Sequence, residues 1–286
     1  MNTAARAFVA ACRAEIEAPK PGNVHVFAGG HDMEAQDFLV SAELAALPLT
    51  QPGGSLGQRV TGAVDVTMAA IGTNTNLGII LLCTPLIMAF ERLGAKASAH
   101  PKFRQSLEEV LDSLDVADSE QVFRAIRQAN PGGMGKVEGS DLQRTPQRPL
   151  RQIMAEARLR DRIARAYADG YADIFDLGIP TLARSRREGR EAWWPATATY
   201  LAFLSAFPDT HIVRKWGEAQ AAWVLQEADT ICHRIRTTSD RLGLLLGFDR
   251  EIKARGLNPG TSADLTVATL FAESLICILR RGPESG

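Results

Sequence analysis

Amide and ionisable side chains are concentrated in a stretch near the N-terminus that is stiffened by glycine and proline. The run PKPGNVH covers residues 19–25, and the run GHDM covers residues 30–33. A turn of this kind that enters a helix presents free backbone N–H groups and the positive end of the helix dipole, which together suit phosphate oxygens. The side chains available there for charge, hydrogen bonding or proton transfer are Lys20, Asn23, His25, His31 and Asp32.

Asp37 and Ser41 follow this stretch and are four residues apart. Residues at this spacing lie on one face of a helix, so both side chains are able to face one site. A second interpretation stays open, in which Asp32 only caps the helix and Asp37 faces solvent. The residues therefore indicate a polar site at the start of this helix without fixing its ligand.

Helical periodicity dominates the rest of the chain, and the alternation typical of strands is scarce. We predict an all-α fold, a single compact multi-helix domain over residues 1–286, with a long Gly/Pro loop near residues 130–149. The predicted helices cover about residues 3–17, 32–47 with Asp32 as N-cap, 55–71, 77–93, 118–129, 150–177, 191–206, 211–237, 239–255 and 263–281.

Charge and composition limit the classes of partner. The chain has 32 basic and 33 acidic residues, for a net charge of −1, so nothing favours nucleic acid or an anionic membrane. Four cysteines without a Cys-x-x-Cys spacing, and an N-terminal segment without a secretory pattern, predict a cytoplasmic protein. We expect small-molecule nucleotide substrates as partners, with no nucleic acid and no membrane. A homodimer is left open.

The N-terminal motif resembles the signature of the triphosphoribosyl-dephospho-CoA synthase family, which has a PKPG turn, a Gly-His element ending in Met, and a helix with Phe and Ser-Ala. Three further segments, which follow it as the second, third and last of four motifs, resemble elements of the same family in the same order. They are NTNLG at residues 74–78, DTHIVRK at residues 209–215 and NPGTSADL at residues 258–265. The resemblance therefore extends over about residues 15–275, nearly the whole chain.

The chain departs from the family pattern at two places. Members that act in citrate lyase prosthetic-group synthesis carry Asn-Thr-His-Lys-Gly, whereas Asn76 and Leu77 stand here in place of His and Lys. Asn-Val-His at residues 23–25 replaces a Leu-Val-Asp type. This form resembles a divergent branch found in archaea and in bacteria with methanopterin-linked one-carbon metabolism. The differences bear on the substrate more than on the fold.

The resemblance implies a reaction that joins the 2′-hydroxyl of dephospho-CoA to C1′ of the ATP ribose and expels adenine. Such a step needs Mg²⁺ for the phosphates of ATP, a carboxylate near the ribosyl carbon and a general base for the hydroxyl. The catalytic candidates are Asp37, Asp209, Asp264 and His31, and the metal candidates are Asp32, Asp37 and Asp209. The substrate-binding candidates are Lys20, Asn23, His25, Ser41, Asn74, Asn76, His211, Arg214, Lys215 and Ser262.

The division of roles among the aspartates stays open, and so do two other functions. A Mg²⁺-dependent nucleotide hydrolase or glycohydrolase would use the same carboxylates but accept water. A non-catalytic, nucleotide-binding helical protein of one-carbon coenzyme biosynthesis is the third hypothesis. The density of polar groups in four segments argues against the third, because buried polar clusters without a ligand are costly.

The histidines of these segments are more typical of hydrogen bonding or proton transfer than of zinc binding. His25, His31 and His211 show neither the HxxxH nor the HExxH spacing of zinc sites. An imidazole that titrates near neutral pH is suited to exchange a proton with a substrate hydroxyl.

Overall fold

The computed structural model describes residues 1–30, 33–94, 100–129 and 145–281. This part of the chain is 74% helical, with fourteen α-helices, one π-helix and no strand, which confirms the predicted all-α class. The helices are α1 Thr3–Ile16, α2 Ala35–Leu49, α3 Leu56–Ile71, α4 Leu77–Leu93, α5 His100–Ser113, α6 Val116–Ala129, α7 Leu150–Ala157, α8 Arg162–Ala168, the π-helix Asp173–Gly178, α9 Ile179–Arg187, α10 Trp194–Leu204, α11 Thr210–Trp216, α12 Glu218–Arg234, α13 Arg241–Ala254 and α14 Gly260–Arg281.

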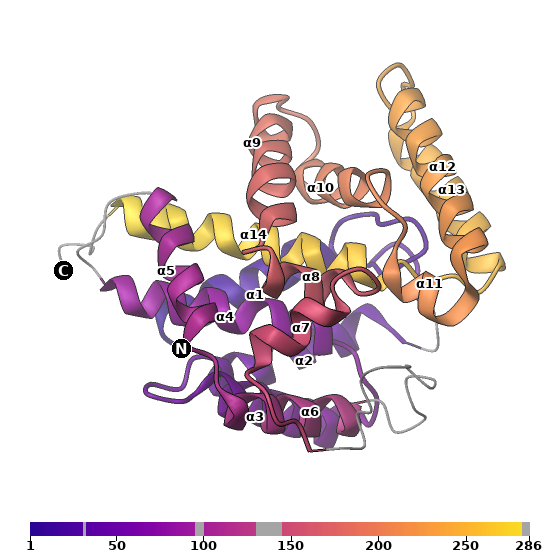
Figure 1. Ribbon diagram of the computed structural model, residues 1–286. Coiled ribbons are helices and arrows are strands. Elements are labelled where there is room, and N and C mark those ends of the chain that lie inside the picture. The colour runs from indigo at the N-terminus through magenta and orange to yellow at the C-terminus, as the bar shows by residue number, and fades with distance from the viewer. Residues whose placement is uncertain (31–32, 95–99, 130–144, 282–286) are drawn as a thin grey trace.

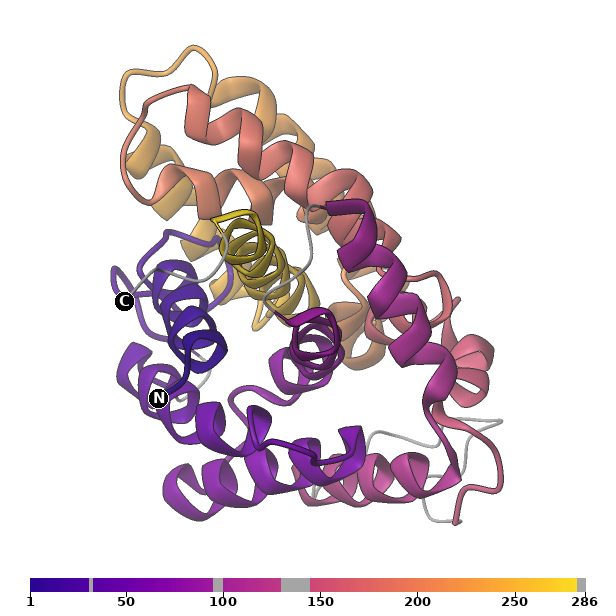
Figure 2. The same cartoon turned by 90° about the vertical axis from the view of Figure 1, so that its left-hand side faces the viewer.

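Helix α14 is the centre of the fold. It packs against α1 and α4 on one side and against α9, α10 and the π-helix on another. Figure 2 shows α14 nearly end-on, with the other helices arranged around it. Phe8 of α1 meets Phe271 of α14 edge-on, with the ring centroids 5.8 Å apart. Because α14 is covered on several sides, its sequence is apolar over most of its circumference.

A second apolar cluster joins α10, α11, α12 and α13, which lie at the opposite end of the molecule from α3 and α6 (Figure 1). Helix α10 also holds the loop that follows α1. Thr197 Oγ1 donates a hydrogen bond to the carbonyl of Pro19 at 2.9 Å, and Tyr200 Oη donates to the carbonyl of Pro21 at 2.7 Å. The backbone of the PKPG turn is therefore fixed from a helix far away in the sequence.

The predicted helix over residues 150–177 is wrong, because the structure divides it into α7, α8 and the π-helix. Asp161 interrupts the predicted helix because it is the N-cap of α8. Its Oδ1 accepts the N–H of Ala164 at 2.9 Å. Gly170 and Tyr171 then take positive φ angles, both 59°, which a continuing α-helix does not allow.

The predicted helix over residues 211–237 is also broken, at Gly217, where φ is +84°. Helix α11 ends before this glycine and α12 begins after it. Helices α5 and α9 lie in segments where we predicted no helix. Each has a proline at its second residue. Helix α9 continues directly from the π-helix, whose last residue, Gly178, has helical φ and ψ angles.

The start of α2 differs from the prediction in its capping residue. The helix begins at Ala35 with Glu34 as N-cap, and the carboxylate of Asp37 accepts the Glu34 N–H at 2.9 Å. The predicted N-cap, Asp32, lies outside the described residues. The predicted loop over residues 130–149 is described only from residue 145 onwards.

Of the described helices, α14 alone is long and apolar enough to cross a membrane by length and composition. However, 72% of its most apolar window is buried inside the protein. This burial explains the apolar composition of α14 by its position in the core.

Close packing of α3 against α6 gives a test of the fold. A Cβ at Gly57 would lie 2.7 Å from Cβ of Gln121 and 3.1 Å from Cα of Asp118. We expect Gly57→Ala to lower the free energy of unfolding by about 1–3 kcal/mol through overpacking. In α13, the atom nearest to a Cβ at Gly247 is 4.0 Å away, at the tip of Arg250, so Gly247→Ala should stabilise the protein by up to about 1 kcal/mol through helix propensity. Urea denaturation followed by circular dichroism measures both, and equal effects would contradict the packing described.

Candidate functional site

The N-terminal ends of α4 and α14 meet inside the molecule. A Cβ at Gly78, in the first turn of α4, would lie 2.0 Å from Oδ2 of Asp264 and 2.9 Å from Cδ1 of Ile163 in α8. Glycine therefore allows the carboxylate of Asp264 to lie directly against α4. Two long helices direct the positive ends of their dipoles towards one region, an arrangement that favours an anionic ligand.

Asp264 is the carboxyl group at this meeting point. Its side chain is partly buried and forms no hydrogen bond with any described residue. Burial raises the pKa of Asp264 well above the usual range of a carboxyl group, and the nearby carboxylates of Glu15 and Asp209 raise it further, while Lys20 opposes them. A carboxyl with unused oxygens is able to exchange a proton with a bound substrate.

A buried ion pair between Glu15 and Lys20 lies next to this carboxyl. Glu15 is 4% exposed and Lys20 is 1% exposed. The ammonium of Lys20 donates a hydrogen bond to the Glu15 carboxylate and also donates to Oδ1 of Asn23 at 3.0 Å. Burial raises the pKa of Glu15 and lowers that of Lys20, because each charge has lost its water. Lys20 thus has a buried acidic partner, and its predicted role in substrate binding stays a prediction.

Asn23 connects the PKPG turn to the last motif. Its Nδ2 donates to Oδ1 of Asn258 at 2.8 Å, across more than two hundred residues of sequence. His25, two residues further on, is 1% exposed, and its Nε2 lies 3.4 Å from Oδ1 of Asp249. Burial lowers the pKa of His25, and the charge of Asp249 opposes this effect. The structure therefore joins the first and last motifs through amide side chains.

Asp209 connects the third motif to the last. Its Oδ1 accepts the N–H groups of His211 and Ile212 at 2.9 and 3.3 Å, and its Oδ2 accepts the N–H and the hydroxyl of Ser262, both at 2.8 Å. Burial raises the pKa of Asp209, and these hydrogen bonds oppose the shift. Because both oxygens are used, Asp209 ties the start of α11 to the start of α14. Its predicted catalytic and metal-binding roles stay predictions.

The remaining residues of the third motif lie along α11. The ring of His211 covers Gly260, where a Cβ would stand 2.7 Å from Nδ1. Arg214 Nη1 is 3.7 Å from Oδ2 of Asp161, and about a third of each side chain is exposed. Lys215 is exposed. Arg214 is therefore the predicted substrate-binding cation that is both accessible to a ligand and adjacent to Asp161, a carboxylate whose charge acts on Asp264.

The second motif, at the start of α4, contacts α2. Ser41 is fully buried, its Oγ lies 2.6 Å from Oγ1 of Thr75, and it donates to the carbonyl of Asp37 at 2.7 Å. Asn74 Oδ1 accepts the N–H of Leu77 at 3.0 Å and so caps α4. Asn76 is 5% exposed, and its buried Nδ2 has no hydrogen-bond partner among the described residues. A buried amide that lacks a partner is costly unless a ligand supplies one.

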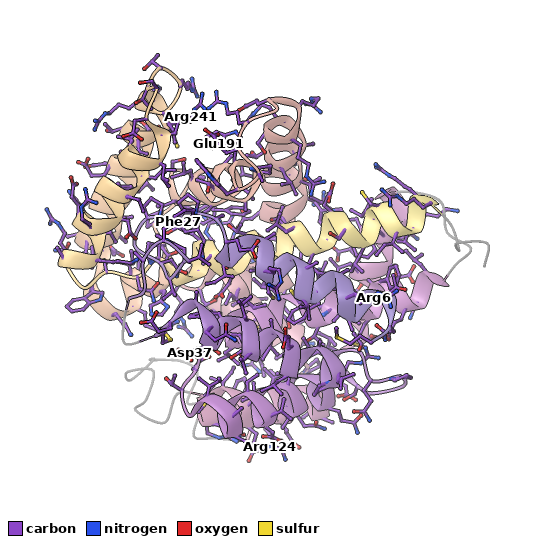
Figure 3. All side chains as sticks on the ribbon, turned by 180° about the vertical axis from the view of Figure 1, so that it is seen from behind. Arg6, Phe27, Asp37, Arg124, Glu191 and Arg241 are labelled. Carbon is purple, nitrogen blue, oxygen red and sulfur yellow. The ribbon has the colours of Figure 1, made fainter. Side chains whose placement is uncertain are left out.

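The predicted metal ligands do not form a closed site in the described part of the chain. No group of three or more His, Cys, Asp or Glu side chains is placed there to hold a metal ion. Asp37 caps α2 at the edge of the molecule, on the same side as Phe27 (Figure 3). His31 and Asp32 lie outside the described residues, so their predicted roles are not addressed by this geometry.

Three residues near the site belong to none of the four motifs. Glu15 lies on the same helical face as the buried residues Phe8 and Cys12, and a carboxylate on an apolar face was the signal that could have found it. Asp161 lies in the interior of a predicted helix, and Asp249 lies in a segment without any motif. The local sequence gives neither of these two a distinguishing pattern.

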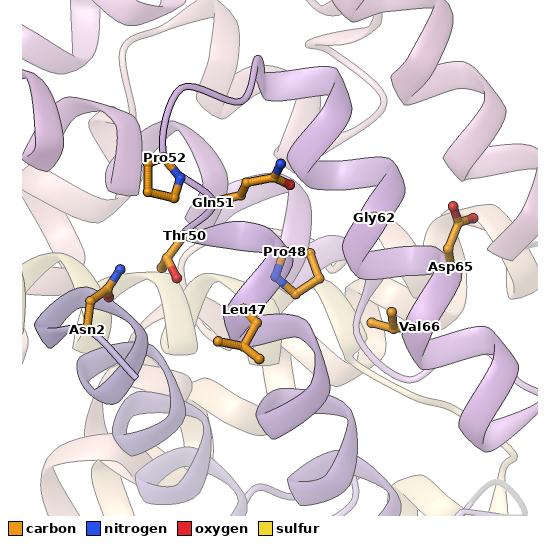
Figure 4. Close-up of a pocket in the computed structure, with 9 residues that line it drawn as sticks. All are labelled: Asn2, Leu47, Pro48, Thr50, Gln51, Pro52, Gly62, Asp65 and Val66. Carbon is orange, nitrogen blue, oxygen red and sulfur yellow. The ribbon is translucent and has the colours of Figure 1, made fainter.

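A shallow cavity of about 660 Å³ lies elsewhere, at the end of α2 and along α3 (Figure 4). It contains no residue of the four motifs and only one ionisable side chain. Its lining residues are Asn2, Leu47, Pro48, Thr50, Gln51, Pro52, Gly62, Asp65 and Val66. Without a cluster of ionisable or amide groups, this cavity does not compete with the region around Asp264 as a reaction site.

Known proteins share both the fold and the sequence family of this chain. The fold is similar to a crystal structure from Archaeoglobus fulgidus, of a protein provisionally assigned as triphosphoribosyl-dephospho-CoA synthase. The TM-score is 0.65, with 24% identity over 83% of this chain and 96% of that chain. The chain belongs to the CitG family, ATP:dephospho-CoA triphosphoribosyl transferase, whose sequence model matches residues 1–281. The expected family is confirmed, and the protein is classed as a triphosphoribosyl-dephospho-CoA synthase-like transferase.

Proposed function

We propose that the protein transfers the triphosphoribosyl group of MgATP to the 2′-hydroxyl of dephospho-CoA, or of a related coenzyme precursor, and releases adenine. The observation that carries the proposal is the carboxyl group of Asp264. It is partly buried, lacks a hydrogen-bond partner among the described residues and lies where the N-terminal ends of α4 and α14 meet.

The proposed step gives Asp264 the role of proton carrier. The acceptor hydroxyl oxygen attacks C1′ of the ribose, and the bond between C1′ and the adenine nitrogen breaks, so that adenine leaves with the electron pair. The carboxylate of Asp264 takes the hydroxyl proton, and the leaving adenine takes one proton from water. Asp264 then returns its proton to the solvent, which leaves the net reaction balanced. Before it takes this proton, the negative charge of Asp264 also stabilises the positive charge that develops at C1′.

The anionic part of ATP is matched by the helix ends. The N-termini of α4 and α14 supply the positive ends of their helix dipoles, and Arg214 supplies an accessible cation for the triphosphate. The amide of Asn76 has an unused donor for a ribose or base oxygen. We infer that Mg²⁺ arrives with ATP, held mainly by phosphate oxygens and by at most one or two carboxylates. No step is assigned to a separate protein-bound ion.

The test is incubation of the pure protein with MgATP, with and without dephospho-CoA, followed by mass spectrometry. We expect free adenine only when dephospho-CoA is present, together with an equal amount of a triphosphoribosyl adduct. Adenine release without an acceptor would favour the glycohydrolase instead. Adenine release only with a different coenzyme precursor would keep the transfer reaction and change the acceptor. If no acceptor supports adenine release, the proposal fails.

A further inference from the structure

A buried polar cluster on α13 lies outside all four motifs and contacts residues 19–30, here called the PKPG loop. Asp249 is 2% exposed, and its Oδ1 accepts the N–H of Gly22 at 2.8 Å. The same oxygen lies 3.4 Å from Nε2 of His25. The carboxylate also accepts a hydrogen bond from Nζ of Lys253 at 3.0 Å. One side chain of α13 thus contacts the loop at two points and binds a cation of its own helix.

Lys253 extends the contact to the far end of the loop. Its ammonium donates to the carbonyl of Ala28 at 3.1 Å, and a Cβ at Gly30 would lie 3.0 Å from its Cε. Asp249 and Lys253 are four residues apart, so they share one face of α13. The pair therefore holds residues 22–30 along one helix face.

The PKPG turn packs closely against α13. Gly22 has a φ of +85°, and a Cβ at this residue would lie 2.3 Å from Cγ2 of Ile252 and 2.9 Å from Cδ of Pro259. The turn is thus pressed against both α13 and the segment that starts α14. Asn23, the next residue, bonds to Asn258 at 2.8 Å, in the same segment. Any displacement of the turn from α13 would consequently move the amides that border the start of α14.

We propose that Asp249 and Lys253 are positioning residues, which hold the PKPG loop in the conformation that the transfer reaction needs. The catalytic consequence rests on the proposed function. The structural consequence, an ordered loop, does not. Among the described contacts, none joins Asp249 or Lys253 to the carboxyl of Asp264. Both residues therefore act through the loop.

The test compares Asp249→Asn with Glu251→Gln, which removes a charge from an exposed position of the same helix. In Asp249→Asn the amide still accepts the Gly22 N–H but no longer neutralises Lys253. We expect kcat to fall by about tenfold to a hundredfold with little change in KM for ATP, because misplaced groups lose rate more than binding. We expect hydrogen exchange of residues 19–30 to accelerate about tenfold, while α14 keeps its protection. Glu251→Gln should change neither quantity.

The two readouts separate this inference from the proposed function. If the wild-type protein releases no adenine but the loop exchanges faster in Asp249→Asn, the proposed function fails and the loop anchor stands. Unchanged exchange and unchanged kcat would overturn the inference. The inference would also be overturned if hydrogen exchange in Asp249→Asn were faster over the whole chain and kcat fell only in proportion to the unfolded fraction. A second variant, Lys253→Met, loses the contact to Ala28 and should reproduce the faster exchange at the end of the loop.

Discussion

Replacing Asp264 by asparagine is expected to lower kcat for adenine release by about 10²–10⁴-fold, the usual contribution of general acid–base catalysis. The amide keeps the shape of the side chain but cannot accept the hydroxyl proton. Because the substitution removes a buried negative charge near Glu15 and Asp209, the melting temperature should not fall. The measurement is steady-state kinetics by quantified adenine, together with a thermal denaturation curve.

The control is Asp229→Asn, which neutralises an exposed carboxylate of α12 and should leave kcat unchanged. The pH profile gives a second check. Asp264 must be deprotonated to act as a base, so kcat/KM of the wild type should fall as pH drops through its raised pKa. That limb should lie above the ordinary carboxyl range and be absent in Asp264→Asn. Full activity of the variant would remove Asp264 from the mechanism.

Replacing Lys20 by methionine is expected to reduce the free energy of unfolding by about 3–5 kcal/mol, because it leaves the carboxylate of Glu15 buried without a partner. This predicted effect is larger than that of a surface substitution, since Lys20 is 1% exposed and bonds to both Glu15 and Asn23. Urea denaturation at neutral pH measures it. The exposed Lys102 is the matched control, and Lys102→Met should change stability little.

A double variant isolates the buried pair. Glu15→Leu combined with Lys20→Met replaces both charges by apolar groups of similar size, which is often neutral or stabilising in protein interiors. We expect the double variant to recover at least half of the stability lost by Lys20→Met. A loss in the double variant equal to the sum of the two single losses would mean that the two side chains do not act as a pair.

Much of the helical architecture could be predicted from the sequence, because apolar periodicity is a local property. Helix α4 was predicted with its observed bounds, and α1 and α3 within one residue. The failures lie where backbone geometry decides. The break at Tyr171 needs a positive φ at a non-glycine residue, which no periodic pattern reveals. Gly217 was a visible signal, but it stands inside a run that otherwise continues the helical period.

The candidate site was only partly predictable, for a physical reason. Motif residues such as Asn23 and Ser262 could be found because several polar groups occur together in the sequence. Their partners could not all be found in this way. Glu15 and Asp249 are single acidic residues in helices, and only tertiary packing brings them to the loop. The segments of the site are therefore more predictable from the sequence than the residues that hold those segments in place.

Helix α14 carries Asp264 near its first turn, while the rest of the same helix forms the centre of the core. The site therefore cannot fold or unfold independently of the core. A ligand that binds at the start of α14 binds only molecules in which the whole helix is packed. Its binding therefore raises the free energy of global unfolding. In the cell, the level of substrate would then influence how long each copy of the chain survives proteolysis, as well as how fast it turns over.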